Sequence, residues 1–341
     1  MGALSIVVIT LFFKNPDSSK PKQATFAQKV AQMDIVGIIL IMGAVVSYIL
    51  AVQYGGQVQA WSSPTVIGLL VATGVILVIF SVWEYFQGER AMVVSRLLKR
   101  RAIFLAALYT MFLGGAFFTM VYYLPIYFQS VQGTTPIGSG VRNLPFILGS
   151  TFGSIASGIF ISATGLSTPT MLGASAIGAV GCGVCALLNE NTTTGKWVGY
   201  QLVAGLALGS GFQLPIIVGQ ASVDLSDIST VTAMLLFFQT LGGSLFVSGA
   251  QAGFANRLLQ VLPYLAPGVE PKKVLSVGAG DIRRTFPPKD VPGIVLGYTE
   301  GLVVTYAIAT TSAGVAFLTN LFLSWKRLDT NALKAAAAGG M

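Results

Sequence analysis

Charged residues are scarce in this sequence, and histidine is missing altogether. Only 9% of the 341 residues are Asp, Glu, Lys or Arg, and 54% are hydrophobic. Soluble proteins carry roughly 25% charged residues. A soluble chain of this length could not cover its surface with so few charges, so lipid must be the solvent for much of the protein. The mean hydropathy of +0.76 agrees with that conclusion.

The missing histidine also excludes imidazole-ligated metals and every Ser-His or Cys-His dyad. The two cysteines, Cys182 and Cys185, lie inside one apolar run, which supports neither a disulfide framework nor a zinc site. No P-loop, G-x-S-x-G motif or pair of carboxylates on one helical face is present. We therefore expect no enzyme, no cofactor and no metal.

Basic residues outnumber acidic ones by 20 to 12, which raises the question of nucleic-acid binding. The basic residues are scattered through the breaks between apolar runs and form no stripe interleaved with aromatic residues. In a membrane protein, such an excess orients loops toward the anionic cytoplasmic leaflet. The sequence predicts a lipid bilayer, and no nucleic acid, as the partner.

A membrane-spanning helix needs about 20 mostly apolar residues. Eight runs are long enough, at 34–53, 64–83, 102–128, 143–163, 169–188, 197–221, 229–253 and 301–325. A ninth run, Gly2 to Phe13, is half a span, and we interpret it as the tail of a span whose beginning is missing from this chain. A short interfacial helix is the alternative. The predicted fold class is all-α and polytopic.

The charges of the short breaks predict the orientation. The break at 14–32 carries four lysines and the break at 84–101 carries five basic residues, whereas 54–63 and 129–140 carry none. The positive-inside rule places the two basic breaks in the cytoplasm. Alternation then puts a long loop at 254–300 outside, where six prolines predict little regular helix in its middle.

Small residues recur at a spacing of four within several spans. Gly149 and Gly153 form one such ladder, and Gly205 and Gly209 form another. In lipid, helix association depends on the close packing that small residues allow. These spans are therefore expected to pack against other helices of the protein.

Polar residues within spans are costly in lipid and often functional. No acid lies near the middle of any predicted span, and Asp34 at the start of one is interpreted as an N-cap rather than a proton relay. Gln213 precedes Leu214-Pro215, where it either lines a cavity or bonds another helix. Gln239 follows Phe237-Phe238, a cluster that suits either a greasy ligand or core packing. Arg142 is a candidate gate, with snorkelling to headgroups as the alternative.

Two segments resemble the fourteen-span drug:proton antiporters of the major facilitator superfamily, closest to the fungal branch that exports toxins and drugs. The first contains Leu124-Pro125-Ile126-Tyr127-Phe128-Gln129, Ser139-Gly140-Val141-Arg142 and Leu144-Pro145. The second is Gln239-Thr240-Leu241-Gly242-Gly243-Ser244. The order of spans also fits. Half of a sixth span comes first, then two linker spans, then six spans of a C-terminal bundle.

The resemblance implies three regions: the end of a truncated span with a cytoplasmic linker at 1–32, two linker helices and a cytoplasmic loop at 33–101, and a six-helix bundle at 102–341. It implies efflux of amphipathic organic compounds by proton-coupled alternating access. The N-terminal six-helix bundle of the family, where the resemblance places the coupling acids, is missing from this chain. We expect it as a partner, together with protons and the substrate.

On this interpretation the substrate contacts the face that bears Gln213, Phe238, Gln239, Tyr109 and Tyr306. The expected location is the plasma membrane, with the vacuolar membrane as the alternative. A different class of function stays open at this point, because one bundle cannot perform alternating access by itself. That alternative is a non-transporting membrane subunit, or an inert remnant, with an interaction role.

Overall fold

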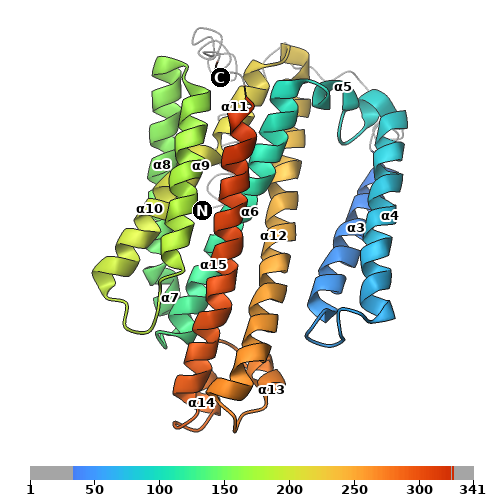
Figure 1. Cartoon of the computed structure of the whole chain (residues 1–341). Coiled ribbons are helices and arrows are strands. Elements are labelled where there is room, and N and C mark those ends of the chain that lie inside the picture. The colour runs from blue at the N-terminus through green and yellow to red at the C-terminus, as the bar shows by residue number, and fades with distance from the viewer. Residues whose placement is uncertain (1–33, 324, 326–341) are drawn as a thin grey trace, which may run out of the picture.

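Long α-helices make up the protein (Figure 1). The computed structural model describes residues 34–323 and 325. Its long helices are α3 (Ile35–Tyr54), α4 (Pro64–Gln87), α6 (Arg101–Ser130), α8 (Leu144–Thr164), α9 (Ser167–Cys185), α10 (Thr194–Phe212), α12 (Ile228–Leu265) and α15 (Val291–Leu321). Shorter helices are α5 (Ser95–Leu98), α7 (Pro136–Arg142), α11 (Leu214–Ala221), α13 (Pro271–Ser276) and α14 (Ile282–Thr285), with 3-10 turns η2 (Gly88–Arg90) and η3 (Leu225–Asp227).

Eight helices of the described chain are long and apolar enough to cross a membrane. They coincide with the eight predicted runs, so the predicted polytopic all-α fold is confirmed. The predicted half-span at 2–13, the lysines of 14–32 and the basic tail after Trp325 lie outside the described residues. The protein is a multi-pass membrane protein.

The connections alternate between two ends of the molecule, as predicted. We call them the α5 end, where the segment 88–100 and η3 lie, and the α14 end, where α7, α13 and α14 lie (Figure 1). The basic break at 84–101 is at the α5 end, and the uncharged break at 129–140 is at the opposite one. The assignment of the α5 end to the cytoplasm remains a prediction from the positive-inside rule.

Six of the spans, α6 to α15, form one bundle around α6. Helix α6 packs on α12 and α15, α8 packs on α10, and α9 lies between α10 and α15. The predicted glycine ladders form the α8–α10 contact, since a Cβ on Gly209 would lie 2.1 Å from the Ser150 carbonyl oxygen. The motif at 239–244 has the same role between α12 and α6, because a Cβ on Gly242 would lie 1.9 Å from the Met111 carbonyl oxygen.

Helices α3 and α4 form a pair beside the bundle, and we call them the linker pair (Figure 1). Two hydrogen bonds fasten α3 and its following loop to α12: the Tyr48 hydroxyl donates to the Leu245 carbonyl (3.1 Å), and the Asn256 amide donates to the Gly55 carbonyl (3.1 Å). Between the linker pair and the bundle lies an apolar cleft of about 490 Å³.

The loop predicted at 254–300 is shorter in the structure. Helix α12 continues to Leu265 and α15 begins at Val291, which leaves 266–290 with the short helices α13 and α14. The extension of α12 is held because Leu258 and Leu262 are fully buried. The middle of the predicted loop therefore has only short helices, as the prolines predict. Its two ends, 254–265 and 291–300, are helical and belong to α12 and α15.

Candidate functional site

A break in one span forms the centre of the candidate site. Helix α10 ends at Phe212 and α11 begins at Leu214, so Gln213 is the residue at the break. Pro215 has no backbone N–H and cannot donate to the carbonyl of Gly211, which interrupts the helical ladder. The side chain of Gln213 is exposed there and has no hydrogen-bond partner within the described chain.

Two other predicted residues pack against this break from inside the bundle. Gln239 is buried, and its amide Nε2 donates to the carbonyl oxygen of Phe212 at 3.1 Å. The Tyr109 hydroxyl donates to the Met171 carbonyl at 3.1 Å and lies 2.6 Å from where a Cβ on Gly211 would stand. The helix-to-helix bond considered for Gln213 is thus made by Gln239. The structure shows Gln239 and Tyr109 as supports of the break.

A groove of about 280 Å³ opens next to the break, between α6, α8 and α10. Its aromatic walls come from Phe117 and Phe212, whose ring centroids are 4.5 Å apart. Its other lining residues are Ser150, Thr151, Ser154, Ile155 and Gly209. We call it the α8–α10 groove. Aromatic walls with a few hydroxyl groups suit a ligand that is mostly apolar.

Two polar groups at or beside the groove are free to bind a ligand. The hydroxyls of Ser150 and Thr151 both donate to the carbonyl of Ile147, so neither has its donor available. The Ser154 hydroxyl lines the groove and makes no hydrogen bond within the described residues, and neither does the exposed amide of Gln213. Among the polar groups at this site, the Ser154 hydroxyl and the Gln213 amide therefore offer donors to a bound molecule.

The remaining two predicted contact residues lie elsewhere. Phe238 lines the apolar cleft on the side of the linker pair. Tyr306 is fully buried in the bundle core, and its hydroxyl has no hydrogen-bond partner within the described chain. The structure therefore does not bring the five predicted residues onto one face: Gln213, Gln239 and Tyr109 surround the break, whereas Phe238 and Tyr306 do not.

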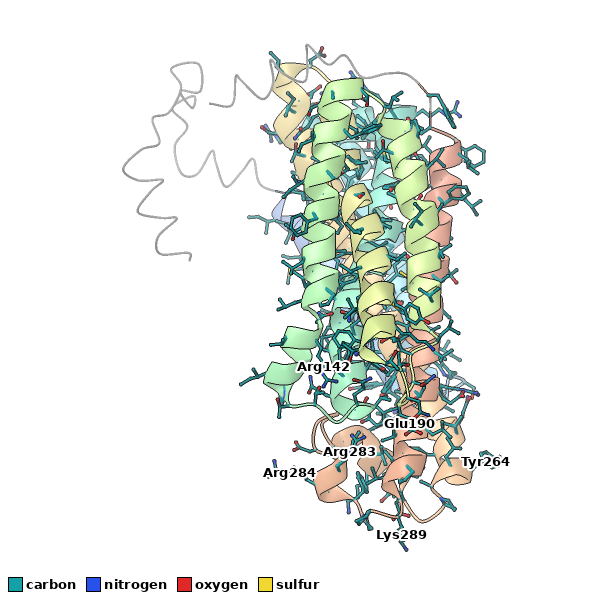
Figure 2. The ribbon with its side chains drawn as sticks, turned by 90° about the vertical axis from the view of Figure 1, so that its left-hand side faces the viewer. Arg142, Glu190, Tyr264, Arg283, Arg284 and Lys289 are labelled. Atoms are coloured by element: carbon teal, nitrogen blue, oxygen red, sulfur yellow. The ribbon has the colours of Figure 1, made fainter. Side chains whose placement is uncertain are left out.

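Arg142, the predicted gate, ends α7 at the α14 end, where Figure 2 also shows Glu190, Arg283 and Lys289. Its guanidinium donates to the Gln132 side-chain oxygen and lies 6.0 Å from the ring centroid of Trp197. Its backbone carbonyl accepts from Gln201 at 3.0 Å. Arg142 thus joins the start of α8 to the start of α10 and the end of α6 through neutral groups, and its gating role stays a prediction.

Sequence reasoning missed the residues that line the groove, namely Phe117, Phe212 and Ser154. In the sequence they look like ordinary lipid-facing or packing residues of apolar spans. One signal was available, because Phe212 stands immediately before the Gln213-Leu214-Pro215 break. No pattern in the sequence predicts that Phe117 reaches it from another helix.

Comparison with known proteins identifies the family. The family described as "Fungal trichothecene efflux pump (TRI12)" matches residues 1–178, which is more than half of the chain. The chain belongs to this family. The resemblance to fungal toxin exporters of the major facilitator superfamily is thereby confirmed.

Individual relatives agree with the family. The MFS-type transporter grgE of Penicillium sp. is 44% identical over 99% of this chain and 60% of its own length. The probable efflux pump gsfJ of Penicillium aethiopicum is 42% identical over 99% of this chain and 61% of its own. The aspyridones efflux protein of Neocamarosporium betae is 36% identical over 99% and 60%. This member of the family therefore spans about 60% of the length of the curated relatives that it matches.

A solved structure also resembles the chain. It is the crystal structure of a bacterial homologue of the human lysosomal transporter Spinster, in an inward-facing and unoccupied conformation. The TM-score is 0.48 and the sequence identity 11%, over 77% of this chain and 60% of that one. The family assignment does not rest on this likeness.

Proposed function

We propose that the chain supplies the C-terminal bundle of an efflux carrier for amphipathic organic compounds, and that it transports rather than catalyses. The observation that carries the proposal is the α8–α10 groove beside the break at Gln213. The groove has two aromatic walls and the free hydroxyl of Ser154, and the exposed amide of Gln213 follows the lining residue Phe212 in the chain. A ligand with a large apolar surface and one or two polar groups fits those walls and donors.

The proposed transport pathway needs a second six-helix bundle facing the groove. Carriers of this architecture work by rocking one bundle against another around a site near the middle of the membrane. Relatives named as transporters and efflux pumps are longer than this chain, which supports the proposal of a partner bundle. We place the proton coupling in that bundle as well, since none of the described residues that line the groove is a carboxylate. The proposed location is the plasma membrane.

An efflux assay tests this function. The chain is expressed in yeast cells that lack their own drug pumps, either alone or joined to the N-terminal six spans of a relative such as grgE, and retention of an amphipathic fluorescent dye is measured. We expect export only from the joined protein. In that protein, Gln213→Ala changes the relative export rates of two dyes by roughly 3- to 30-fold, the effect of one polar contact of about 0.6–2 kcal/mol in a membrane.

Gln260→Ala is the matched control. Like Gln213, Gln260 is an exposed glutamine, but it belongs to α12 and lies near the α14 end, away from the groove. It should leave the dye selectivity unchanged. A joined protein that inserts in the membrane but exports no dye would refute the proposed function. Export by the chain alone would refute the need for a second bundle and support an independent carrier.

A further inference from the structure

Two acids are buried in the linker pair, at the α5 end. Asp34 precedes the first residue of α3 and is 7% exposed, and Glu84 lies in the last turn of α4 and is 4% exposed. Glu84 is the only charged residue of α4, and α3 has none. Buried acids are rare unless a partner compensates them, so the groups around these two carboxyls are of interest.

One oxygen of each carboxyl is well satisfied. Asp34 Oδ1 accepts hydrogen bonds from the Gly37 backbone N–H (2.9 Å) and from the Trp83 indole N–H (2.8 Å). Glu84 Oε2 accepts one from the Val93 backbone N–H (2.7 Å). These bonds join the start of α3, the end of α4 and the segment 91–94, so the two carboxyls lie where three pieces of chain meet.

The other two oxygens face each other. Asp34 Oδ2 and Glu84 Oε1 are both buried, and neither accepts a hydrogen bond from an N–H group of the described chain. They meet beside Gly37, because a Cβ on that residue would lie 2.1 Å from the first and 2.7 Å from the second. A side chain at position 37 would therefore occupy the space between them.

No cation of the described residues neutralises the pair. The charged residues on the neighbouring elements η2 and α5 and just after α5 point to other partners. Arg96 binds Glu89 at 2.8 Å and Asp227 at 2.9 Å, and Lys99 lies 5.6 Å from the centroid of the Tyr85 ring. Arg90 is exposed and makes no ion pair with another described residue. Among residues 34–323, the two carboxyls are thus each other's only titratable neighbours at this place.

Two ionised carboxylates that meet in a buried space repel strongly, so such pairs retain one proton. Hydrogen-bond donors favour the ionised form. Burial raises the pKa of Asp34, but its hydrogen bonds, among them those from the Trp83 indole and the Gly37 backbone, outweigh burial and leave that pKa below its usual value. Asp34 accepts hydrogen bonds from two N–H groups and Glu84 from one, so Asp34 is the carboxylate of the pair and the proton belongs to Glu84.

We propose that Asp34 and Glu84 form a binding site for a single proton, in which protonated Glu84 Oε1 donates to Asp34 Oδ2. The bound proton holds the linker pair and the segment 91–94 together. Its release leaves two negative charges in one buried space, which admits water and loosens the bond from Val93 to Glu84. The site lies outside the α8–α10 groove and does not rest on the proposed transport function.

Infrared spectroscopy of the purified full chain in lipid nanodiscs tests the site directly, because a protonated carboxyl has a carbonyl stretch that a carboxylate lacks. We expect this band at neutral pH in the unmodified protein and in Glu89→Gln, which removes a neighbouring exposed acid. The band should be missing in Glu84→Gln. Its absence from the unmodified protein at neutral pH, or its persistence unchanged in Glu84→Gln, would overturn the proposal.

Hydrogen exchange at the segment 91–94 tests the consequence. A glutamine at position 84 can accept from Val93 and donate to Asp34, so it imitates the protonated state at every pH. Compared at the same alkaline pH, the segment should exchange at least several-fold faster in the unmodified protein and in Glu89→Gln than in Glu84→Gln. Equal exchange in all three at every pH would show that no proton holds this segment.

Discussion

Exchanging each of two glutamines for leucine separates the residue that supports the break from the residue that is free to bind a ligand. In the unmodified protein, Gln239 Nε2 donates a hydrogen bond to the Phe212 carbonyl oxygen at 3.1 Å, and Gln239→Leu removes this buried donor. A hydrogen bond between helices in a membrane contributes about 0.6–2 kcal/mol. The unfolding equilibrium should therefore shift by roughly 3- to 30-fold toward the unfolded state. In Gln213→Leu no hydrogen bond between described residues is lost, and we expect a change in unfolding free energy within about 0.5 kcal/mol.

The assay is reversible unfolding of the purified protein in mixed micelles of increasing denaturing detergent, followed by circular dichroism. The exposed position of Gln213 makes its variant the matched control for the amide-to-leucine change. Equal destabilisation of both variants would refute the distinction. So would a Gln239→Leu protein as stable as the parent, because the break would then not depend on the bond from α12.

Three further predictions concern packing and topology. Gly242→Ala should destabilise the bundle by about 1–3 kcal/mol, because the added Cβ would lie 1.9 Å from the Met111 carbonyl oxygen. Gly74→Ala is the control and should not destabilise it, because its Cβ meets no atom within 4 Å. The same detergent unfolding measures both variants, and equal stabilities would contradict the described packing of α12 on α6. A cysteine at the exposed position 62 should react with an impermeant thiol reagent added outside cells, and a cysteine at the exposed position 226 should not. The two native cysteines, Cys182 and Cys185, are buried and should give little background labelling. The reverse labelling would contradict the predicted orientation in the membrane. Trypsin added outside should cut after Arg284, whose side chain is 85% exposed. Arg283→Ala should speed this cleavage, because Arg283 donates hydrogen bonds to the carbonyls of Ser130 (3.1 Å) and Val131 (2.9 Å) that hold the loop in place. An unchanged cleavage rate would show that these bonds do not hold the loop.

The spans could be predicted because lipid imposes a simple rule, a run of apolar residues long enough to cross it. The same rule misplaced the C-terminal end of α12 and the N-terminal end of α15. Charged residues at Arg257 and Glu300 stopped the predicted runs, yet in the structure they form an ion pair at 2.7 Å between the two helices. Helix continues past them because Leu258 and Leu262 pack into the core. Tertiary contacts decided these boundaries.

The candidate site was predicted only in part, for a similar reason. Proline chemistry identified the break at Gln213, and the N-cap role of Asp34 is confirmed by its bond to the Gly37 amide. The burial of Glu84 depends on a backbone N–H at Val93, which only the folded segment 91–94 supplies. Phe117 reaches the groove from another helix. Contacts between distant segments leave no periodic signal in a single sequence.

Substrate protection of a cysteine at position 213 tests the central claim most directly. In the protein joined to a second bundle, Gln213→Cys should react with a small membrane-permeant thiol reagent, since the side chain is exposed at the break. An exported amphipathic compound should slow that reaction, while leaving the reaction of Gln260→Cys unchanged. If a compound that is demonstrably exported leaves the cysteine at 213 fully reactive, the carrier does not bind it at the break beside the α8–α10 groove.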